Sequence, residues 1–398
     1  MVLVWCIFIS LNLLVVNGQW IQSTNTIKSK GFIKTTALYF NVIQSSSQPK
    51  SLIECCGYCG TIETCQGVKY EGNNCTAINN ILPNFRATKE HYAWIDSELY
   101  SRTRKLILFS GSTKSTEIID LSFESSHLLA NTYPASIGAK ISDAETMICQ
   151  PTSSNCGYFE TVKPHEFTPL TQFLTGPREN AAVIGLPEKE GLWIIGGETA
   201  TTDEIITKGG SQPGPPSPEV DTKKHCVVRI NSTTVFSIGG RKGGTLSKNT
   251  WLCHMTSDQP ENWKWIEGPK LNRARMDHAC ATWNVNDKII VTVVSGYGRV
   301  SGENVHFTST ELLEMETDKW IYGPEIPLGL KNPSITQVSL DKQNELYLFG
   351  GNDPEANTEV NTIQKLSCED QNDSNTCQWI TLPQKLQIPR SSGIVIQL

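Results

Sequence analysis

Residues 268–320 read GPKLNRARMDHACATWNVNDKIIVTVVSGYGRVSGENVHFTSTELLEMETDKW and hold the clearest copy of a pattern that recurs along the chain. An apolar segment, IIVTVVSG, ends in Ser-Gly at Gly296; STELLEM follows it, and DKWIYGP closes the unit with Trp320. Short apolar segments bounded by Gly, Pro and Asn are typical of β-strands, and hardly any helical periodicity occurs between residues 100 and 398. The stretch therefore predicts a unit of short β-strands.

The same order of features recurs from residue 100 to the C-terminus. Strands that end in paired glycines or Ser-Gly finish at Gly111, Gly197, Gly240, Gly296 and Gly351, at intervals of 86, 43, 56 and 55 residues. The first interval equals two periods of 43 residues, so we expect a degenerate unit around AETMICQ and CGYFETV. Four short strands per unit of about 50 residues are typical of a propeller blade.

These units resemble kelch repeats, most clearly at residues 268–279, 295–297 and 309–320. As in the family pattern, an Arg and a His-Ala pair precede the first strand, and a glycine turn, an acidic strand and a Trp follow it. The resemblance covers about 295 residues and implies an all-β, kelch-type β-propeller over residues 104–398. The glycines would allow a sharp turn near the crowded axis, and the tryptophans would fill the wedges between neighbouring blades.

The number of blades follows from the two ends of the repeat region. The first unit begins at residue 104 with its glycine-terminated strand and lacks the strand before it, whereas residues 389–397 form a strand with no unit after it. We expect this last strand to complete the first blade, which leaves no exposed sheet edge. The propeller is then six-bladed, with five or seven blades still open because the second unit is degenerate.

A cysteine-rich segment precedes the repeats. The run SLIECCGYCGTIETCQGVKYEGNNCTAI, residues 51–78, resembles the core of PAN/apple-like domains, in which a Cys-bearing helix precedes a Cys-Gln-Gly-Val-x-Tyr strand. The resemblance implies a small disulfide-rich α+β domain over residues 30–101, of a kind that binds proteins or carbohydrates. Cys56 and Cys59 also match a redox Cys-x-x-Cys motif, but the cysteines around them favour a structural cluster, and no histidine has the spacing of a zinc site.

Twelve of the 13 cysteines remain once Cys6 leaves with a signal peptide, and in an oxidising compartment we expect them to form disulfides. Two pairs, Cys149/Cys156 and Cys368/Cys377, flank short polar turns and predict hairpin disulfides. The small domain has five cysteines and the repeats have seven, and both numbers are odd. Either one disulfide joins the two regions, or two thiols stay free, or a disulfide joins two molecules. The candidates are Cys55, Cys56, Cys59, Cys65, Cys75, Cys149, Cys156, Cys226, Cys253, Cys280, Cys368 and Cys377.

The N-terminus, MVLVWCIFISLNLLVVNGQW, predicts a signal peptide over residues 1–18. Its apolar run, residues 2–16, is shorter than the roughly 20 residues that span a bilayer. We therefore expect a secreted, extracellular protein that is not inserted in a membrane after cleavage. Sequons at Asn74, Asn231 and Asn372 predict N-glycosylation and agree with export.

Charge and motif content argue against several classes of protein. The formal net charge of −6 is unfavourable for binding nucleic acid or an anionic membrane. The chain has no nucleophile elbow, P-loop, His-Glu-x-x-His or dinucleotide fingerprint. Galactose oxidase, a kelch-propeller enzyme, holds copper with tyrosines and histidines that include a Tyr-His dipeptide, and this chain has no such dipeptide. We therefore expect no catalytic residues, no cofactor and no metal, and a packing role for His278.

The predicted function is recognition. A propeller presents loops from every blade around one central depression, which suits a peptide or a glycan. We expect an extracellular protein- or carbohydrate-binding protein of recognition or adhesion, with a secreted carbohydrate-active enzyme (oxidase- or epimerase-like) as the alternative and a structural matrix component as a third possibility. Candidate ligand contacts on the loop rim are Arg178, Arg273, Arg275, Tyr297 and Arg390, although salt bridges within the ring are the more expected role of the arginines.

Overall fold

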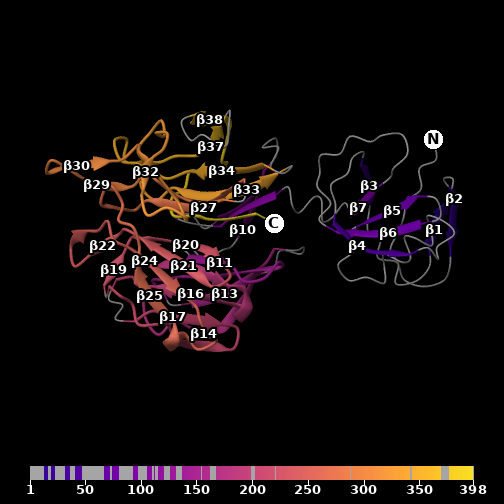
Figure 1. The fold of residues 1–398 in the computed structure, drawn as a ribbon, viewed down its shortest axis with the longest axis horizontal. Helices are drawn as coiled ribbons and strands as arrows, with labels where there is room; N and C mark the ends of the chain where they lie inside the picture. The colour runs from indigo at the N-terminus through magenta and orange to yellow at the C-terminus, as the bar shows by residue number, and fades with distance from the viewer. Residues whose placement is uncertain are drawn as a thin grey trace. The chain divides into compact units, whose positions relative to one another are not determined.

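The structure is a computed structural model, and it describes residues 105–397 with short gaps, together with the backbone of seven strands before them. The gaps are residues 110–111, 113–114, 121–125, 131–136, 154, 162–166, 199–201, 220, 287, 341–342 and 369–375. The chain divides into two compact units, residues 1–105 with 340–343, and residues 106–339 with 344–398. Both units are drawn in Figure 1.

The described backbone of the first unit forms three small antiparallel sheets. Their pairs are β1 (Leu13–Val16) with β2 (Gln19–Gln22), β3 (Phe32–Thr35) with β7 (Ala93–Asp96), and β6 (Asn74–Asn79) with both β4 (Asn41–Ser46) and β5 (Gly67–Glu71). The Cys-bearing helix expected in this region lies outside the described residues, as do the side chains of its five cysteines.

The second unit consists of β-strands, and its main elements are six four-stranded antiparallel sheets that follow one another along the chain. The helical segments with described bounds are two 3₁₀ turns, Pro187–Lys189 and Pro260–Asn262. The prediction of an all-β fold is therefore confirmed for this unit.

The first three sheets, numbered in chain order, are built as follows. Sheet 1 contains β8 (Lys105–Phe109), β9 (Ser115–Asp120), β10 (Ser126–Ala130) and β39 (Ile394–Gln397); sheet 2 contains β11 (Ile137–Lys140), β12 (Glu145–Cys149), β13 (Asn155–Glu160) and β14 (Phe167–Phe173); sheet 3 contains β15 (Ala182–Leu186), β16 (Gly191–Ile195), β17 (Glu204–Thr207) and β18 (Gly210–Pro213).

The other three sheets have the same design. Sheet 4 contains β20 (Cys226–Asn231), β21 (Thr234–Ile238), β24 (Thr250–His254) and β25 (Lys264–Glu267); sheet 5 contains β27 (Ala279–Val285), β28 (Lys288–Val294), β31 (Thr310–Glu314) and β32 (Ile321–Tyr322); sheet 6 contains β33 (Ser334–Leu340), β34 (Gln343–Phe349), β37 (Thr362–Cys368) and β38 (Cys377–Lys385).

The C-terminal strand belongs to sheet 1, where β39 pairs antiparallel with β8, with Ile394 opposite Phe109. Strand β10 forms the opposite edge of this sheet. Strand β39 lies at one edge of its sheet, in the place that β11, β15, β20, β27 and β33 have in theirs. These six are called the first strands, and the other strands of each sheet are counted from them in the order of hydrogen-bonded neighbours. The first strands of successive sheets lie side by side from β39 through β11, β15 and β20 to β27.

In sheets 3 and 4 the second strand is the most buried one. Strands β16 and β21 are buried along their whole length, since strands of the same sheet flank them on both sides and neighbouring sheets cover both faces. Such strands have continuous apolar sequences rather than alternating ones, which is the pattern seen before each glycine pair. At the end of β21, Gly239 and Gly240 have φ of 63° and 92°. A β-carbon at Gly240 would lie 2.7 Å from the carbonyl oxygen of Lys223, so the turn requires glycine.

Two tryptophans of the repeats pack between neighbouring sheets. Trp320 of sheet 5 is 2% exposed, stacks on Phe236 of sheet 4 with ring centroids 6.3 Å apart, and donates its indole N–H to the Pro269 carbonyl over 2.7 Å. Trp379 of sheet 6 donates to Oγ1 of Thr310 on sheet 5 over 3.1 Å. These side chains fill the space between sheets, as the sequence predicted.

The two predicted hairpin disulfides are present. Cys149–Cys156 joins β12 to β13 in the degenerate second unit, and Cys368–Cys377 joins β37 to β38. A third disulfide, Cys226–Cys280, ties β20 of sheet 4 to β27 of sheet 5. Three disulfides therefore hold the described part of the second unit.

Cys253 does not form a disulfide, so its inclusion among the bridge candidates was wrong. It is a free cysteine in a core cluster with Trp193, Ile205 and Val235 and is 0% exposed. Burial, with a further contribution from Asp203, raises the pKa of its thiol to about 12. The unpaired cysteine of the repeats is thus an inert, protonated side chain of the core.

Candidate binding site

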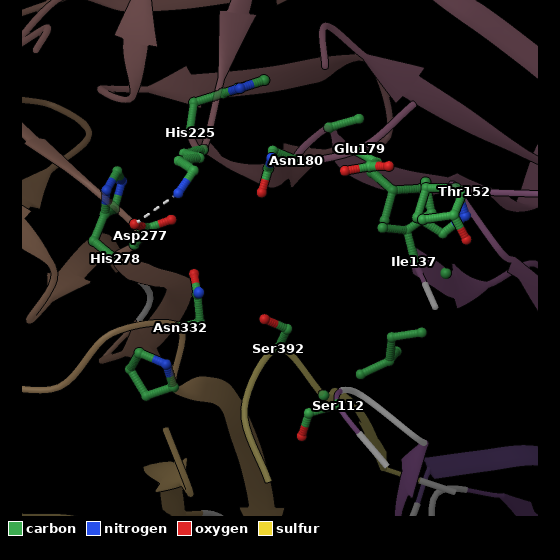
Figure 2. Close-up of a pocket in the computed structure, with 18 residues that line it drawn as sticks. Ser112, Ile137, Thr152, Glu179, Asn180, His225, Asp277, His278, Asn332 and Ser392 are labelled. Atoms are coloured by element: carbon green, nitrogen blue, oxygen red, sulfur yellow. Dashed lines mark hydrogen bonds and ion pairs between the residues drawn. The ribbon is translucent and has the colours of Figure 1, made fainter. Parts of the chain in front are cut away.

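A cavity of about 500 Å³ lies where the first strands of the six sheets begin. Each sheet contributes to its lining. This cavity is called the central pocket, and the residues that represent sheets 1 to 6 in it are Ser392, Ile137, Asn180, Lys224, Asp277 and Asn332. Figure 2 shows the side chains of Ser392, Ile137, Asn180, Asp277 and Asn332 arranged around an open centre.

Five of these residues share one unusual backbone conformation. The φ angles are 60° at Asn180, 56° at Lys224, 54° at Asp277, 49° at Asn332 and 54° at Ser392. These values lie in the left-handed region, which Asn and Asp tolerate better than most residues. The conformation turns the chain sharply from the preceding loop into the first strand.

A chain of backbone hydrogen bonds joins the same five residues. The N–H of Lys224 donates to the carbonyl of Asn180 over 2.8 Å, that of Asp277 to Lys224 over 3.1 Å, and those of Asn332 and Ser392 to the preceding member over 2.8 Å each. Each bond crosses from one sheet to the next. The positions of the pocket side chains are therefore fixed by the backbone rather than by side-chain packing alone.

Two charged side chains of the pocket pair with each other. Nζ of Lys224 lies 3.2 Å from Oδ2 of Asp277, and the side chain of Asp277 is 6% exposed. Figure 2 marks this contact between sheets 4 and 5. Glu179, the other carboxylate of the lining, is exposed to solvent.

The wall formed by sheets 1 to 3 carries aliphatic side chains between its polar ones. Ile137, Val183 and Ile394 belong to the lining, and all three are half-buried. A β-carbon at Gly138 would lie 3.0 Å from Cδ1 of Ile394, so this glycine lets sheets 1 and 2 approach closely. The pocket thus combines a polar side with an aliphatic one.

His225 and His278 directly follow Lys224 and Asp277 and are buried. Burial lowers the pKa of His225 to about 4 and, with help from the charge of Arg275, that of His278 to about 3. In Figure 2 neither ring points into the open centre. A β-carbon at Gly196 or Gly239 would lie 3.2 or 3.1 Å from Cε1 of these two rings, so both are neutral packing groups between sheets.

Three of the arginines proposed as ligand contacts are buried and do not line a rim. Arg178, Arg275 and Arg390 are 5%, 0% and 1% exposed. Each pairs with a buried glutamate on the third strand of its own sheet, at 3.0 Å for Arg178–Glu204, 2.7 Å for Arg275–Glu311 and 3.3 Å for Arg390–Glu117. The ligand role was wrong for these residues because the guanidinium groups are already paired inside the unit.

The other two candidates lie at the surface but outside the central pocket. Arg273 is exposed, and its guanidinium lies over the rings of Phe307 and Tyr322 at 5.3 and 5.6 Å. Tyr297 is half-buried, with its ring 5.6 Å from Nζ of Lys331. The structure does not bring Arg273 or Tyr297 together with the residues of the pocket.

Of the three sequons, one has described side chains. Asn231 is exposed at the end of β20, and its Oδ1 accepts hydrogen bonds from the N–H and the hydroxyl of Thr233 over 2.9 and 3.1 Å. Asn74 begins β6, and Asn372 lies outside the described residues. Glycosylation stays a prediction at all three.

Sequence reasoning missed the pocket residues, although a signal for them exists. Asn180, Asp277 and Ser392 each stand two residues after an arginine of the repeat, and Lys224 and Asn332 occupy the same phase in units without that arginine. Aligning the units on their first strands would have found a polar residue at this position in five of the six units. Within the described residues, no group of three His, Cys, Asp or Glu side chains could hold a metal ion.

Neither the protein-family models nor the curated proteins match this chain. Among the described residues, no helix has the length and apolar character needed to cross a membrane.

Proposed function

We propose that this chain is a secreted recognition protein that binds an extracellular protein or glycan in the central pocket and catalyses no reaction. The observation that carries the proposal is the pocket itself, to which all six sheets contribute and in which five polar residues are held by one chain of backbone hydrogen bonds. Concave sites with a few well-placed polar groups are the usual form of a ligand site.

We further propose that the six sheets are the blades of a kelch-type propeller. Three observations support this arrangement: six four-stranded sheets in chain order, first strands that lie side by side, and the pairing of β39 with β8. Kelch and PAN/apple-like identity rest on the sequence resemblances. Disulfides form in oxidising compartments, so the three present here favour export.

Secretion and binding can be tested on the same preparation. The full chain, expressed in eukaryotic cells, is expected in the medium with Gln19 as its first residue and with glycans that a glycosidase removes. It is then applied to an array of glycans and extracellular proteins. A saturable hit that weakens when Asn180 and Asn332 are both replaced by glycine supports recognition through the pocket. Retention in the cell would refute secretion, and absence of any hit would refute recognition and turn attention to oxidase and epimerase assays.

A further inference from the structure

We propose that the central pocket takes one neutral sugar ring, presented at the end of a glycan. This inference rests on the proposed recognition function and names the ligand class of the same site. It follows from the hydrogen-bonding capacity, the charge balance and the two-sided character of the pocket lining.

The uncharged polar groups of the pocket match hydroxyl groups. The amides of Asn180 and Asn332 and the hydroxyl of Ser392 each both donate and accept hydrogen bonds, as sugar hydroxyls do. Their backbones are held by the hydrogen bonds between sheets. Little ordering is therefore needed when a ligand binds, and this reduces the entropic cost of association.

The charges of the pocket favour a neutral ligand. Lys224 and Asp277 neutralise each other at 3.2 Å, and the neighbouring His225 and His278 are neutral above pH 5 because burial lowers their pKa values to about 4 and about 3. An anionic ligand would have to break this pair and would also face the carboxylate of Glu179, whereas a cationic ligand that leaves the pair intact would have only Glu179, which is exposed and screened by solvent, as its counter-ion. A neutral sugar keeps the pair and can hydrogen-bond to both members of it.

The aliphatic side of the pocket separates a sugar from other neutral polar ligands. A pyranose ring exposes C–H groups on its faces and hydroxyl groups around its edge. Ile137, Val183 and Ile394 offer a surface for such a face, whereas Lys224, Asp277 and Asn332 come from the opposite sheets. In Figure 2, Ile137 lies across the open centre from Asp277. The volume of about 500 Å³ is typical of a small-molecule site, ~300–1,000 Å³.

The test compares variants that remove a pocket side chain without straining the backbone. Asn180→Gly and Asn332→Gly suit this purpose because glycine adopts the left-handed region freely. The matched control is Asn357→Gly, since Asn357 has a φ of 51° and is exposed in the turn between β35 (Asn352–Asp353) and β36 (Thr358–Glu359), outside the pocket lining.

Methyl glycosides of neutral hexoses, of N-acetylhexosamines and of glucuronic acid are titrated into the full secreted chain, with acidic and basic peptides as competitors, by saturation-transfer NMR and calorimetry. We expect at least one neutral glycoside to bind the parent protein and Asn357→Gly equally. Binding to Asn180→Gly and Asn332→Gly should be about tenfold weaker, as expected for one lost hydrogen-bonding partner. The unfolding midpoints of all variants should stay close to that of the parent.

Three results would overturn the inference: no neutral glycoside binds at millimolar concentration, glucuronide or a peptide binds better than every neutral glycoside, or the pocket variants bind as the parent does. The array distinguishes failure of the sugar proposal from failure of the recognition proposal. If proteins on the array bind, the two pocket variants weaken that binding, and no glycoside binds, then recognition through the pocket is supported and the sugar is excluded. If neither the array nor any glycoside gives binding, both proposals fail.

Discussion

At the scale of single residues, Asp203 is a carboxyl group whose ionisation is opposed by its surroundings. Its side chain is 1% exposed. Burial raises its pKa to about 7, even though a hydrogen bond from the N–H of Gly196 at 3.0 Å, the charge of Arg178 and the indole of Trp193 favour the ionised form. The residue sits just before β17, at the turn that follows the glycine pair of sheet 3, so its protonation is linked to the stability of that turn.

Asp203 should make the protein less stable as the pH rises from about 4 to 7. In this window the folded protein holds a proton that the unfolded chain, with a carboxyl pKa of 3.8, has released, so unfolding is favoured by each increase in pH. In Asp203→Asn this dependence is absent. The unfolding free energy of the variant minus that of the parent should therefore be larger at pH 7 than at pH 4, by up to about 4 kcal/mol. Urea unfolding at several pH values measures this difference.

The comparison between parent and variant cancels the contribution of the buried histidines, which has the opposite sign. The folded-state pKa values of His225 and His278 lie below 6.5, so their contribution to stability is present above pH 6.5 and is lost as the pH falls. The exposed Asp258→Asn serves as the control for removing a carboxylate at the surface. A difference between parent and Asp203→Asn that does not vary with pH would contradict the assignment.

At the scale of the elements, a recurring ion pair joins the loop before the first strand to the third strand of the same sheet. In sheet 5 both partners are 0% exposed, and Nη1 of Arg275 also donates to the carbonyls of Ser295 and Ser309 over 2.7 and 3.1 Å. Burial lowers the pKa of Arg275, and the charge of Glu311 counteracts this effect. Because both groups are desolvated, the arrangement is stable only as a complete pair.

Replacing one partner should therefore cost far more than replacing both. Glu311→Gln or Arg275→Met leaves one buried charge without its counter-ion, and either change should lower the unfolding free energy by about 3–5 kcal/mol. The double variant should lose less than the sum of the two, which a double-mutant cycle in urea measures. The exposed pair Lys270–Glu267 is the control, with an expected effect below about 1 kcal/mol. Additive effects at Arg275 and Glu311 would argue against the coupling.

The disulfide between sheets should stabilise more than the hairpin disulfides do. Cys226–Cys280 closes a loop with a sequence separation of 54, whereas Cys149–Cys156 closes one of 7. By the loop-entropy relation, Cys226→Ala with Cys280→Ala should lower the unfolding free energy by about 4 kcal/mol, and Cys149→Ala with Cys156→Ala by about 2 kcal/mol. Urea unfolding under oxidising conditions tests the order, and under reducing conditions the differences should largely disappear. Equal losses for the two pairs would refute the argument from loop length.

The two disulfides also illustrate which features could be predicted from the sequence and which could not. Features set by neighbours along the chain were predictable, namely the buried strands before each glycine pair and the hairpin bridge Cys149–Cys156. Among the features that depend on which parts of the chain become neighbours, the pairing of β39 with β8 and the tryptophans between sheets were predicted, whereas Cys226–Cys280 and the pocket were not. The arginines were visible in the repeat, but their partners were not, since Arg390 pairs with Glu117 at a sequence separation of 273.

At the scale of the whole second unit, the ends of the chain segment 106–398 meet in sheet 1. Besides pairing with β8, the C-terminal segment donates from Arg390 to the carbonyl of Ser115 over 3.0 Å and accepts at the carbonyl of Gly393 from the Ser334 hydroxyl of sheet 6 over 2.7 Å. The segment thus contacts sheets 1 and 6 together. In the proposed six-bladed ring, the last strand completes the closure, so the unit should depend on it more than an open row of sheets would.

Deleting residues 389–398 should therefore destabilise the entire unit rather than fray one end. The deletion removes the partner of Glu117 and leaves the edge of β8 unpaired, and an unpaired edge promotes association between molecules. We expect a lower and broader urea transition together with oligomers in size-exclusion chromatography, and partial recovery when a peptide of residues 387–398 is added. An open row would lose only the local contribution of sheet 1, so a shortened chain that unfolds at the parent's midpoint and stays monomeric would contradict ring closure.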